Sequence, residues 1–206
     1  MDAKSLYLIM TNPIIGYQKL TEIAVNCGVS IIQLRIKDHK VNKINLAIDL
    51  RNITKGTNTK FIVNDDINLA MKSDADGIHL GQNDLSITQA KDLWKNKNKI
   101  FGISTHNQHQ AIQAEKNGAD YIGIGPIFST FSKKNLDPLL GIEKASRINN
   151  SCNCPSFTIG GISLNNIKQI KKIGSRGFCV LSAINYSKNP EKIINSFKDE
   201  WESNDF

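Results

Sequence analysis

Two short runs in the middle of the chain decide how the rest is read: FIVND at residues 61–65 and GIHLGQND at residues 77–84. Each begins with apolar, β-prone residues and ends in polar ones, as a buried strand does where it enters a loop. The apolar residues between the runs suit a short crossover helix, so the stretch predicts a βαβ unit. Right-handed βαβ geometry places both strand ends at one rim, where Asp65 and Asp84 would meet.

These two carboxylates support two interpretations. With an amide and water they form a hard-oxygen site suited to Mg²⁺, especially where a phosphate group completes the coordination. Alternatively, Asp65 and Asp84 are helix N-caps or turn residues, roles that Asp favours. This stretch alone leaves both interpretations open.

The composition is that of an ordinary globular protein, with 40% hydrophobic and 22% charged residues among 206. That length is sufficient for one domain with a substantial core. No apolar run approaches the length of a membrane span, and the first residues, MDAK, lack the features of a signal peptide. We therefore expect a cytoplasmic protein without a membrane partner.

The cysteines do not indicate a zinc protein, and the net charge does not by itself indicate a nucleic-acid-binding protein. The four cysteines lack the paired spacing of a zinc site, so we expect free thiols at Cys27, Cys152, Cys154 and Cys179. The net charge of +7 suits either a nucleic-acid surface or a surface that steers anionic substrates. The lysines are dispersed and no nucleic-acid motif accompanies them, so we expect no nucleic-acid partner.

Strand-like and helix-like segments alternate along the chain. Four segments share a helix end, a turn and an apolar strand, at residues 27–34, 74–80, 118–124 and 174–181. Four more candidate strands lie between them, at residues 6–10, 61–63, 100–103 and 156–159. Amphipathic stretches fill the gaps, at residues 20–25, 44–53, 111–116 and 167–173. This pattern predicts one (β/α)₈ TIM-barrel domain over residues 1–206, and the even repeat favours it over a doubly wound open sheet.

In such a barrel, active groups lie where strands enter the following loops. After the second strand, alternation places Gln33, Arg35 and Lys37 on one side, where two cations suit a diphosphate; an exposed basic strand end is the alternative. Ser104, at the end of the fifth strand, either binds a ligand or caps the next helix.

The later strand ends predict a second anion site. Residues 125–135 after the sixth strand carry hydroxyls and lysines and have the length of a functional lid. Glycines after the seventh strand, including Gly161, and a short helix start after Leu181 form the usual phosphate site of a barrel. Two anion sites predict two phosphorylated substrates, one of them bound to the metal.

Taken in order, these residues resemble the thiamine phosphate synthase (thiamine-phosphate pyrophosphorylase) family from about Tyr7 to Ile184. The resemblance rests on QLRIK at 33–37, ND at 64–65, GIHLGQND at 77–84, GIS at 102–104, GIGPIF at 123–128, IGGI at 159–162 and LSAI at 181–184. The family joins 4-amino-2-methyl-5-(diphosphooxymethyl)pyrimidine to 4-methyl-5-(2-phosphoethyl)thiazole, giving thiamine phosphate and diphosphate. The resemblance implies a dissociative reaction, in which diphosphate leaves before the thiazole nitrogen attacks.

The resemblance also implies a role for each matching residue. Asp65 and Asp84 would bind the Mg²⁺ ion. The pyrimidine diphosphate would be held by Gln33, Arg35, Lys37, Asn64 and Ser104, with Ser104 at the pyrimidine. The thiazole phosphate would be held by Thr130, Ser132, Gly161, Leu181 and Ser182. The catalytic candidates are Arg35, Lys37, Ser104 and Lys133, of which Lys133 would reach the diphosphate when the lid closes.

Three positions depart from the family pattern. Ile36 stands where an acidic residue is common, Asp66 where arginine is frequent, and Ser132 replaces a threonine. Asp66 adds negative charge beside the expected metal site. None of the three removes a group that the reaction needs.

Other functions remain as alternatives. The related thiazole tautomerase shares the fold but relies on a histidine after the sixth strand, where residues 125–128 are GPIF. A catalytically silent phosphate-binding module is disfavoured by the intact carboxylate pair, and a phosphosugar isomerase by the lack of an acid–base pair. The sequence leaves the oligomeric state open, a homo-oligomer included.

Overall fold

Eight parallel strands close into a barrel in the computed structural model, which describes residues 5–36, 42–130 and 138–203. Each strand pairs with the next along the chain, and the first pairs with the last. The strands are β1 (Ser5–Met10), β2 (Ile31–Leu34), β3 (Lys60–Asn64), β4 (Gly77–Leu80), β5 (Ile100–Thr105), β6 (Tyr121–Ile124), β7 (Ser156–Thr158) and β8 (Gly177–Val180). The predicted closed barrel is confirmed, and the open sheet is wrong.

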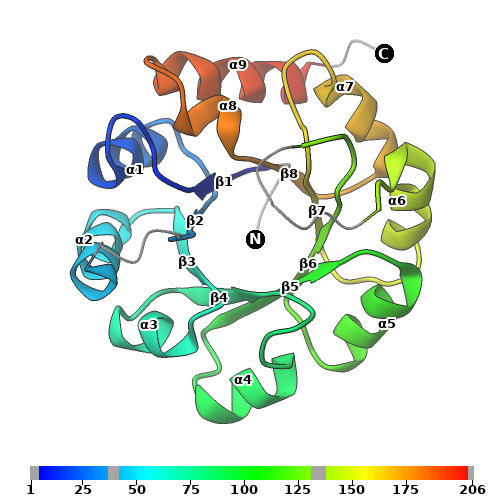
Figure 1. Ribbon diagram of the computed structural model, residues 1–206, viewed down its shortest axis with the longest axis horizontal. Helices are drawn as coiled ribbons and strands as arrows, with labels where there is room; N and C mark the ends of the chain where they lie inside the picture. The colour runs from blue at the N-terminus through cyan, green and yellow to red at the C-terminus, as the bar shows by residue number, and fades with distance from the viewer. Residues whose placement is uncertain (1–4, 37–41, 131–137, 204–206) are drawn as a thin grey trace.

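Helices surround the barrel on the outside (Figure 1). They are α1 (Tyr17–Asn26), α2 (Lys43–Thr54), α3 (Ile67–Lys72), α4 (Ile87–Leu93), α5 (Gln108–Lys116), α6 (Gly141–Asn149), α7 (Ile167–Ile170) with the 3₁₀ turn Lys171–Ile173, α8 (Ser182–Asn185) and α9 (Pro190–Glu202). Several begin at a polar side chain that accepts a backbone N–H three residues further on: Asn42, Asp66, Ser86, Asn107 and Asn189. Local capping therefore sets many of the helix starts.

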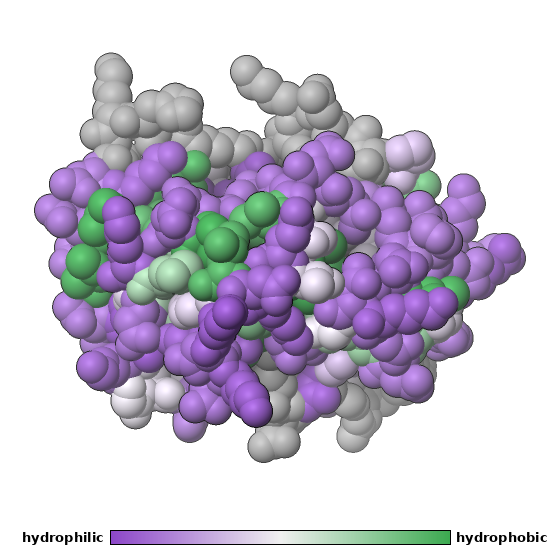
Figure 2. All heavy atoms as spheres, turned by 90° about the horizontal axis from the view of Figure 1, so that it is seen from below, coloured by the Kyte–Doolittle hydropathy of each residue, from purple (hydrophilic) through white to green (hydrophobic). Residues whose placement is uncertain are grey.

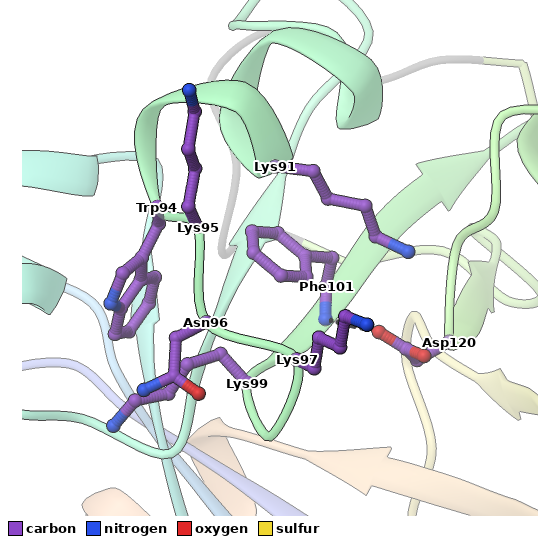
Figure 3. A pocket seen from close by; sticks show the side chains of 8 residues that line it. All are labelled: Lys91, Trp94, Lys95, Asn96, Lys97, Lys99, Phe101 and Asp120. Atoms are coloured by element: carbon purple, nitrogen blue, oxygen red, sulfur yellow. Dashed lines mark hydrogen bonds between the residues drawn. The ribbon is translucent and has the colours of Figure 1, made fainter.

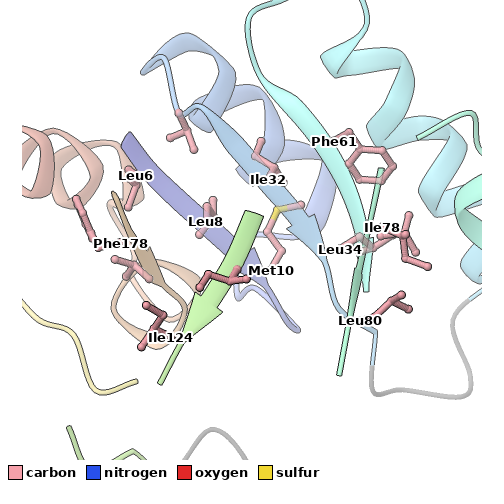
Figure 4. Close-up of a cluster of buried hydrophobic side chains, with 14 of the residues drawn as sticks. Leu6, Leu8, Met10, Ile32, Leu34, Phe61, Ile78, Leu80, Ile124 and Phe178 are labelled. Carbon is pink, nitrogen blue, oxygen red and sulfur yellow. The ribbon is translucent and has the colours of Figure 1, made fainter. Parts of the chain in front are cut away.

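Two apolar layers hold the barrel together, because successive strand residues face opposite sides of the sheet. The outer layer fills the space between strands and helices and is shown in Figure 4, with Leu6, Leu8, Met10, Ile32, Leu34, Phe61, Ile78, Leu80, Ile124 and Phe178 labelled. The inner layer fills the barrel itself and comprises Tyr7, Ile9, Ile31, Ile62, Tyr121, Phe157 and Cys179. The barrel is thus a packed core, and its chemistry is confined to the ends.

The outer surface is mostly hydrophilic. Figure 2, which views the side carrying α4 in Figure 1, shows hydrophilic side chains over most of this face, with hydrophobic ones gathered in patches. Within the described ranges, no helix combines the length and hydropathy that a membrane crossing needs.

A pocket of about 360 Å³ lies at the amino-terminal ends of β5 and β6 (Figure 3). It is lined by Lys91, Trp94, Lys95, Asn96, Lys97, Lys99, Phe101 and Asp120. The Nζ atom of Lys91 lies 5.5 Å from the Phe101 ring centroid, and that of Lys99 lies 5.0 Å from the Trp94 ring centroid. Lysines of this part of the chain therefore cover aromatic rings of the core. The pocket lies at the end of the barrel opposite to the predicted site residues.

Gly102 makes room for an aromatic ring inside the barrel. A Cβ atom added at Gly102 would overlap the ring of Tyr121, whereas one added at Gly123 on the next strand would lie 3.4 Å from the nearest atom, His79 Cε1. The Tyr121 ring is fully buried and has little space to move aside. The bare backbone at Gly102 is thus a packing requirement.

Gly102→Ala should therefore lower the free energy of unfolding by about 2–3 kcal/mol, the cost of overpacking a rigid interior. Gly123→Ala is the matched control and should cost less than about 1 kcal/mol, since its Cβ meets no overlap. Chemical denaturation of both variants measures the difference. Equal losses would show that Tyr121 does not depend on the gap at Gly102.

Candidate active site

Asp65 and Asp84 meet at the carboxyl ends of β3 and β4, as the βαβ geometry predicts. Asp65 directly follows β3, and its backbone N–H donates to the His79 carbonyl at 2.9 Å. Asp84 ends the turn after β4, where its Oδ2 accepts the Gly81 N–H at 2.7 Å. The two carboxyl groups lie close enough for the charge of Asp84 to raise the pKa of Asp65. Asp84 therefore also serves as a turn residue, so the two interpretations of this side chain are compatible.

The carboxylate pair is electrostatically unfavourable in the free protein. The pKa of Asp65 is raised to about 6, first by desolvation of its carboxyl group and then by the charge and hydrogen bond of Asp84. The positive charge of Arg35 and a hydrogen bond from Asn64 act in the opposite direction. The compensation is incomplete, so the pair favours a proton or a cation between the carboxylates.

The neighbouring strand ends bring two further predicted residues to the same place. Arg35 follows β2, with its backbone N–H donating to the Met10 carbonyl at 3.0 Å and its charge close enough to affect Asp65. Asn64 is the last residue of β3, and its side chain lies close enough to the Asp65 carboxyl to lower the pKa of that group. Lys37 lies outside the described residues, so its role stays a prediction.

Beneath this rim, a chain of hydrogen bonds runs through the barrel interior. The Nε2 of Gln33 donates to the Tyr7 hydroxyl at 2.7 Å, and the Tyr7 and Tyr121 hydroxyls lie 2.8 Å apart. The Tyr121 hydroxyl lies 3.0 Å from Nδ1 of His79, whose Nε2 lies 3.0 Å from the Ser104 hydroxyl. Gln33 is only 2% exposed, so its side chain lies inside the barrel. Its predicted contact with a diphosphate stays a prediction.

The same side chains line a small interior cavity of about 20 Å³, room for about one water molecule. Burial lowers the pKa of His79 to about 4, although the charge of Asp84 acts in the opposite direction. The imidazole is therefore neutral near pH 7 and is a hydrogen-bonding group. Sequence reasoning identified Ser104 but missed Tyr7 and Tyr121. The available signal was that each tyrosine places a hydroxyl group at an inward-facing position of its strand.

The second predicted anion site lies at the neighbouring ends of β7 and β8. Gly160 and Gly161 have φ angles of 104° and 63°, which favour glycine, and a Cβ at Gly161 would overlap the backbone of the loop after β6. Leu181 and Ser182 begin the short helix α8, as predicted. Backbone of two strand ends and of the β6 loop therefore gathers here.

A buried asparagine that the sequence analysis missed joins this region to β1. The Nδ2 group of Asn185 donates to the carbonyls of Ile9 and Leu181, each at 2.7 Å, and its Oδ1 accepts the Thr11 N–H at 2.9 Å. Its position directly after the motif LSAI at 181–184, four residues from Leu181, was the available signal. Asn185 thereby holds the helix start at one position relative to the barrel.

Three predicted residues belong to the loop after β6. Thr130 is half-buried and lies within the described part of the chain. Ser132 and Lys133 lie outside the described residues, so their roles and the closure of a lid stay predictions.

The protein groups available to a metal are few. In residues 5–36, 42–130 and 138–203, no three His, Cys, Asp or Glu side chains gather as a possible metal cluster. All four cysteines are free thiols, as expected. Asp65 and Asp84 thus form a two-carboxylate site, which suits a metal that takes the rest of its ligands from substrate and water.

Comparisons with known proteins point to one family. The chain matches the family model for thiamine monophosphate synthase over residues 6–184. It is 42% identical over 168 residues to the thiamine-phosphate synthase of Clostridium botulinum, covering 81% of this chain and 82% of that protein. The Halalkalibacterium halodurans protein of the same name is 41% identical over 168 residues, covering 81% and 79%.

Solved structures give the same result. The thiamine phosphate pyrophosphorylase from Pyrococcus furiosus superposes with a TM-score of 0.87 at 31% identity, covering 96% of this chain and 95% of that one. A 3-hexulose-6-phosphate synthase superposes with a TM-score of 0.69 at 15% identity, which shows a shared fold alone.

The crowding of the carboxylates predicts that Asp65→Asn stabilises the free protein. The pKa of Asp65 is raised in the folded protein, so its negative charge opposes folding. This effect is complete above about pH 6, where the group is ionised in both the folded and the unfolded state. It disappears below about pH 4, where the group is protonated in both. Asn also suits the positive φ of 62°. After allowance for solvent screening, the gain should be about 1 kcal/mol, or about 2–4 °C in Tm at pH 8.

Thermal unfolding from pH 4 to pH 8, without divalent cations, measures this effect. Asp66→Asn is the matched control, because it removes the same charge at the next residue while keeping an oxygen that can cap α3. A Tm of Asp65→Asn at or below the wild-type value at pH 8 would contradict the crowding of the two carboxylates.

Proposed function

The chain belongs to the thiamine monophosphate synthase family, and we propose that it joins 4-amino-2-methyl-5-(diphosphooxymethyl)pyrimidine to 4-methyl-5-(2-phosphoethyl)thiazole. The products are thiamine phosphate and diphosphate, and the chain is a transferase. The observation that carries the proposal is the meeting of Asp65 and Asp84 beside Arg35, in a chain that matches the family from residue 6 to residue 184. Both substrates are small charged molecules, which is compatible with the expected cytoplasmic location.

The donor set fits Mg²⁺. Asp65 and Asp84 would hold the ion with hard carboxylate oxygens, and the raised pKa of Asp65 indicates negative charge that Arg35 compensates only in part. When bound, Mg²⁺ neutralises negative charge on the departing diphosphate. Asn64 lies beside the Asp65 carboxyl and favours its charged form, and the Arg35 guanidinium can grip diphosphate oxygens bidentately. Lys37 and Lys133 would add positive charge at the same diphosphate.

The pyrimidine would bind at Ser104, above the packed interior of the barrel. In the dissociative order that we propose, the carbon–oxygen bond to diphosphate breaks first, and the thiazole nitrogen then attacks the resulting methylene cation. Bond breaking of this kind needs charge stabilisation at the leaving group and no general base. His79 supports this order, because its lowered pKa of about 4 makes it a weak base and both of its ring nitrogens are already hydrogen-bonded, to Tyr121 and Ser104.

The thiazole phosphate would bind at the ends of β7 and β8. Backbone N–H groups around Gly161, Leu181 and Ser182 would receive it, together with the hydroxyls of Thr130 and Ser132. The positive φ of Gly161 and the anchoring of α8 by Asn185 support a preformed backbone cradle at this point. The two phosphate groups would thus be held on different sides of the barrel mouth.

A coupled assay for diphosphate release from the two substrates tests the proposal. The wild type should release diphosphate only when both substrates and Mg²⁺ are present, and a chelator should stop the release. Asp84→Asn keeps an oxygen that can accept the Gly81 N–H but removes the negative charge that would bind the metal. Its kcat/KM should therefore fall at least about 100-fold.

Asp66→Asn again serves as the control, and its kcat/KM should stay within about threefold of the wild type, because Asp66 caps α3. Release that is indifferent to the chelator, or equal losses in both variants, would refute the metal role of the carboxylate pair.

A further inference from the structure

The hydrogen-bond chain inside the barrel ends on Ser104 and has no other evident purpose. Tyr7 and Tyr121 are 1% and 0% exposed, and both rings pack in the apolar inner layer. Burying two phenol hydroxyls, an amide and an imidazole costs free energy unless each group is paired. An all-apolar interior would fill the same space more simply, so the polar chain calls for a functional reason.

Counting the available protons fixes which group donates at each step of this hydrogen-bond series. Because Nε2 of Gln33 donates to the Tyr7 oxygen, the single proton of Tyr7 is left for the Tyr121 oxygen. The single proton of Tyr121 is then left for Nδ1 of His79. A neutral imidazole whose Nδ1 accepts carries its proton on Nε2, and that proton goes to the Ser104 hydroxyl oxygen.

Ser104 therefore has one proton left to give. Its hydroxyl has no second partner among the residues that the structure describes. Its backbone is also held, because Nε2 of Gln82 donates to the Ser104 carbonyl at 2.6 Å. The hydroxyl lines the small interior cavity at the carboxyl end of β5, beneath the carboxylate rim.

We propose that this buried relay fixes the Ser104 hydroxyl as a hydrogen-bond donor and so selects a substrate ring with an unprotonated acceptor nitrogen. The relay consists of four positioning residues: Gln33, Tyr7, Tyr121 and His79. The opposite direction would leave only lone pairs on Ser104 and would select a ring amino group instead. The inference rests on the proposed function, in which the bound ring is a pyrimidine that carries both kinds of group.

The tautomer of His79 tests the relay without any substrate. In ¹⁵N NMR spectra of the full chain labelled at histidine, His79→Gln identifies the His79 signals among the four histidines. We expect Nε2 protonated and Nδ1 unprotonated, unchanged between pH 6 and pH 8. Tyr121→Phe should lose this preference, and Tyr7→Phe should weaken it, because the proton order begins where Gln33 donates to Tyr7. A proton on Nδ1 in the wild type would overturn the proposal.

Steady-state kinetics test what the relay does. Tyr121→Phe should raise the KM for the pyrimidine diphosphate about tenfold, the value of one hydrogen bond of ordinary strength, and leave the KM for the thiazole phosphate unchanged. Thr59→Val removes a buried hydroxyl that lies outside the relay, just before β3, where it donates to the Val29 carbonyl at 2.8 Å, and it should change neither KM by more than about threefold. It is therefore the matched control for a loss of stability.

Each outcome decides the matter. Equal pyrimidine KM values in both variants, or a change in Tm with no change in KM, would mean that the relay is only structural and would overturn the proposal. A wild type that forms no thiamine phosphate would instead defeat the proposed function, and the His79 tautomer would still decide the direction of the relay.

Discussion

Two negative charges held side by side at the ends of β3 and β4 are the constraint on which the site depends. Asp65 is held by a left-handed backbone and a hydrogen bond to β4, and Asp84 by a turn that closes on Gly81. Neither arrangement relieves the repulsion, and Arg35 relieves it only in part. Free energy from the packed barrel therefore maintains a carboxylate pair that by itself would separate. Such a pair is useful because binding a cation removes the repulsion.

The barrel supports this arrangement through the difference between its two layers. The outer layer is continuous and apolar, so the helices clamp the strands in register. The inner layer is mixed, with aromatic rings fitted against glycine backbone, as at Gly102 and Tyr121. A hydroxyl-bearing ring in that layer can connect side chains on strands that are far apart in the sequence. The interior is thus both the packing support of the rim and the route by which Ser104 is oriented.

The departures from the family pattern have local explanations where the structure describes them. Asp66 caps α3 by accepting the Leu69 N–H at 3.0 Å, so it serves the helix that joins β3 to β4. Ile36 is half-buried and packs against the outer apolar layer, where an acidic side chain would lose part of its contact with water. Each residue is therefore suited to its own surroundings. Ser132 lies outside the described residues.

The sequence by itself determined the strands, the barrel and the meeting of Asp65 and Asp84. These follow from local signals: apolar runs of period two, polar strand ends, and a crossover whose handedness has one common solution. Alternation also placed Gln33 on the same side of its strand as Arg35, and the strand end singled out Ser104 as a candidate. Such signals depend only on one strand and its neighbour, so they can be read without knowledge of the rest of the chain.

Only the tertiary structure decided which inward-facing groups touch. Tyr7 and Tyr121 are 114 residues apart, and Asn185 is 176 residues from the Ile9 carbonyl that it binds. Contacts of this kind depend on closure of the barrel and on the space that glycines leave inside it. The raised pKa of Asp65 and the lowered pKa of His79 likewise arise from desolvation, which depends on every neighbour at once. Sequence pattern says which way a side chain points; only the packed interior determines what it meets there.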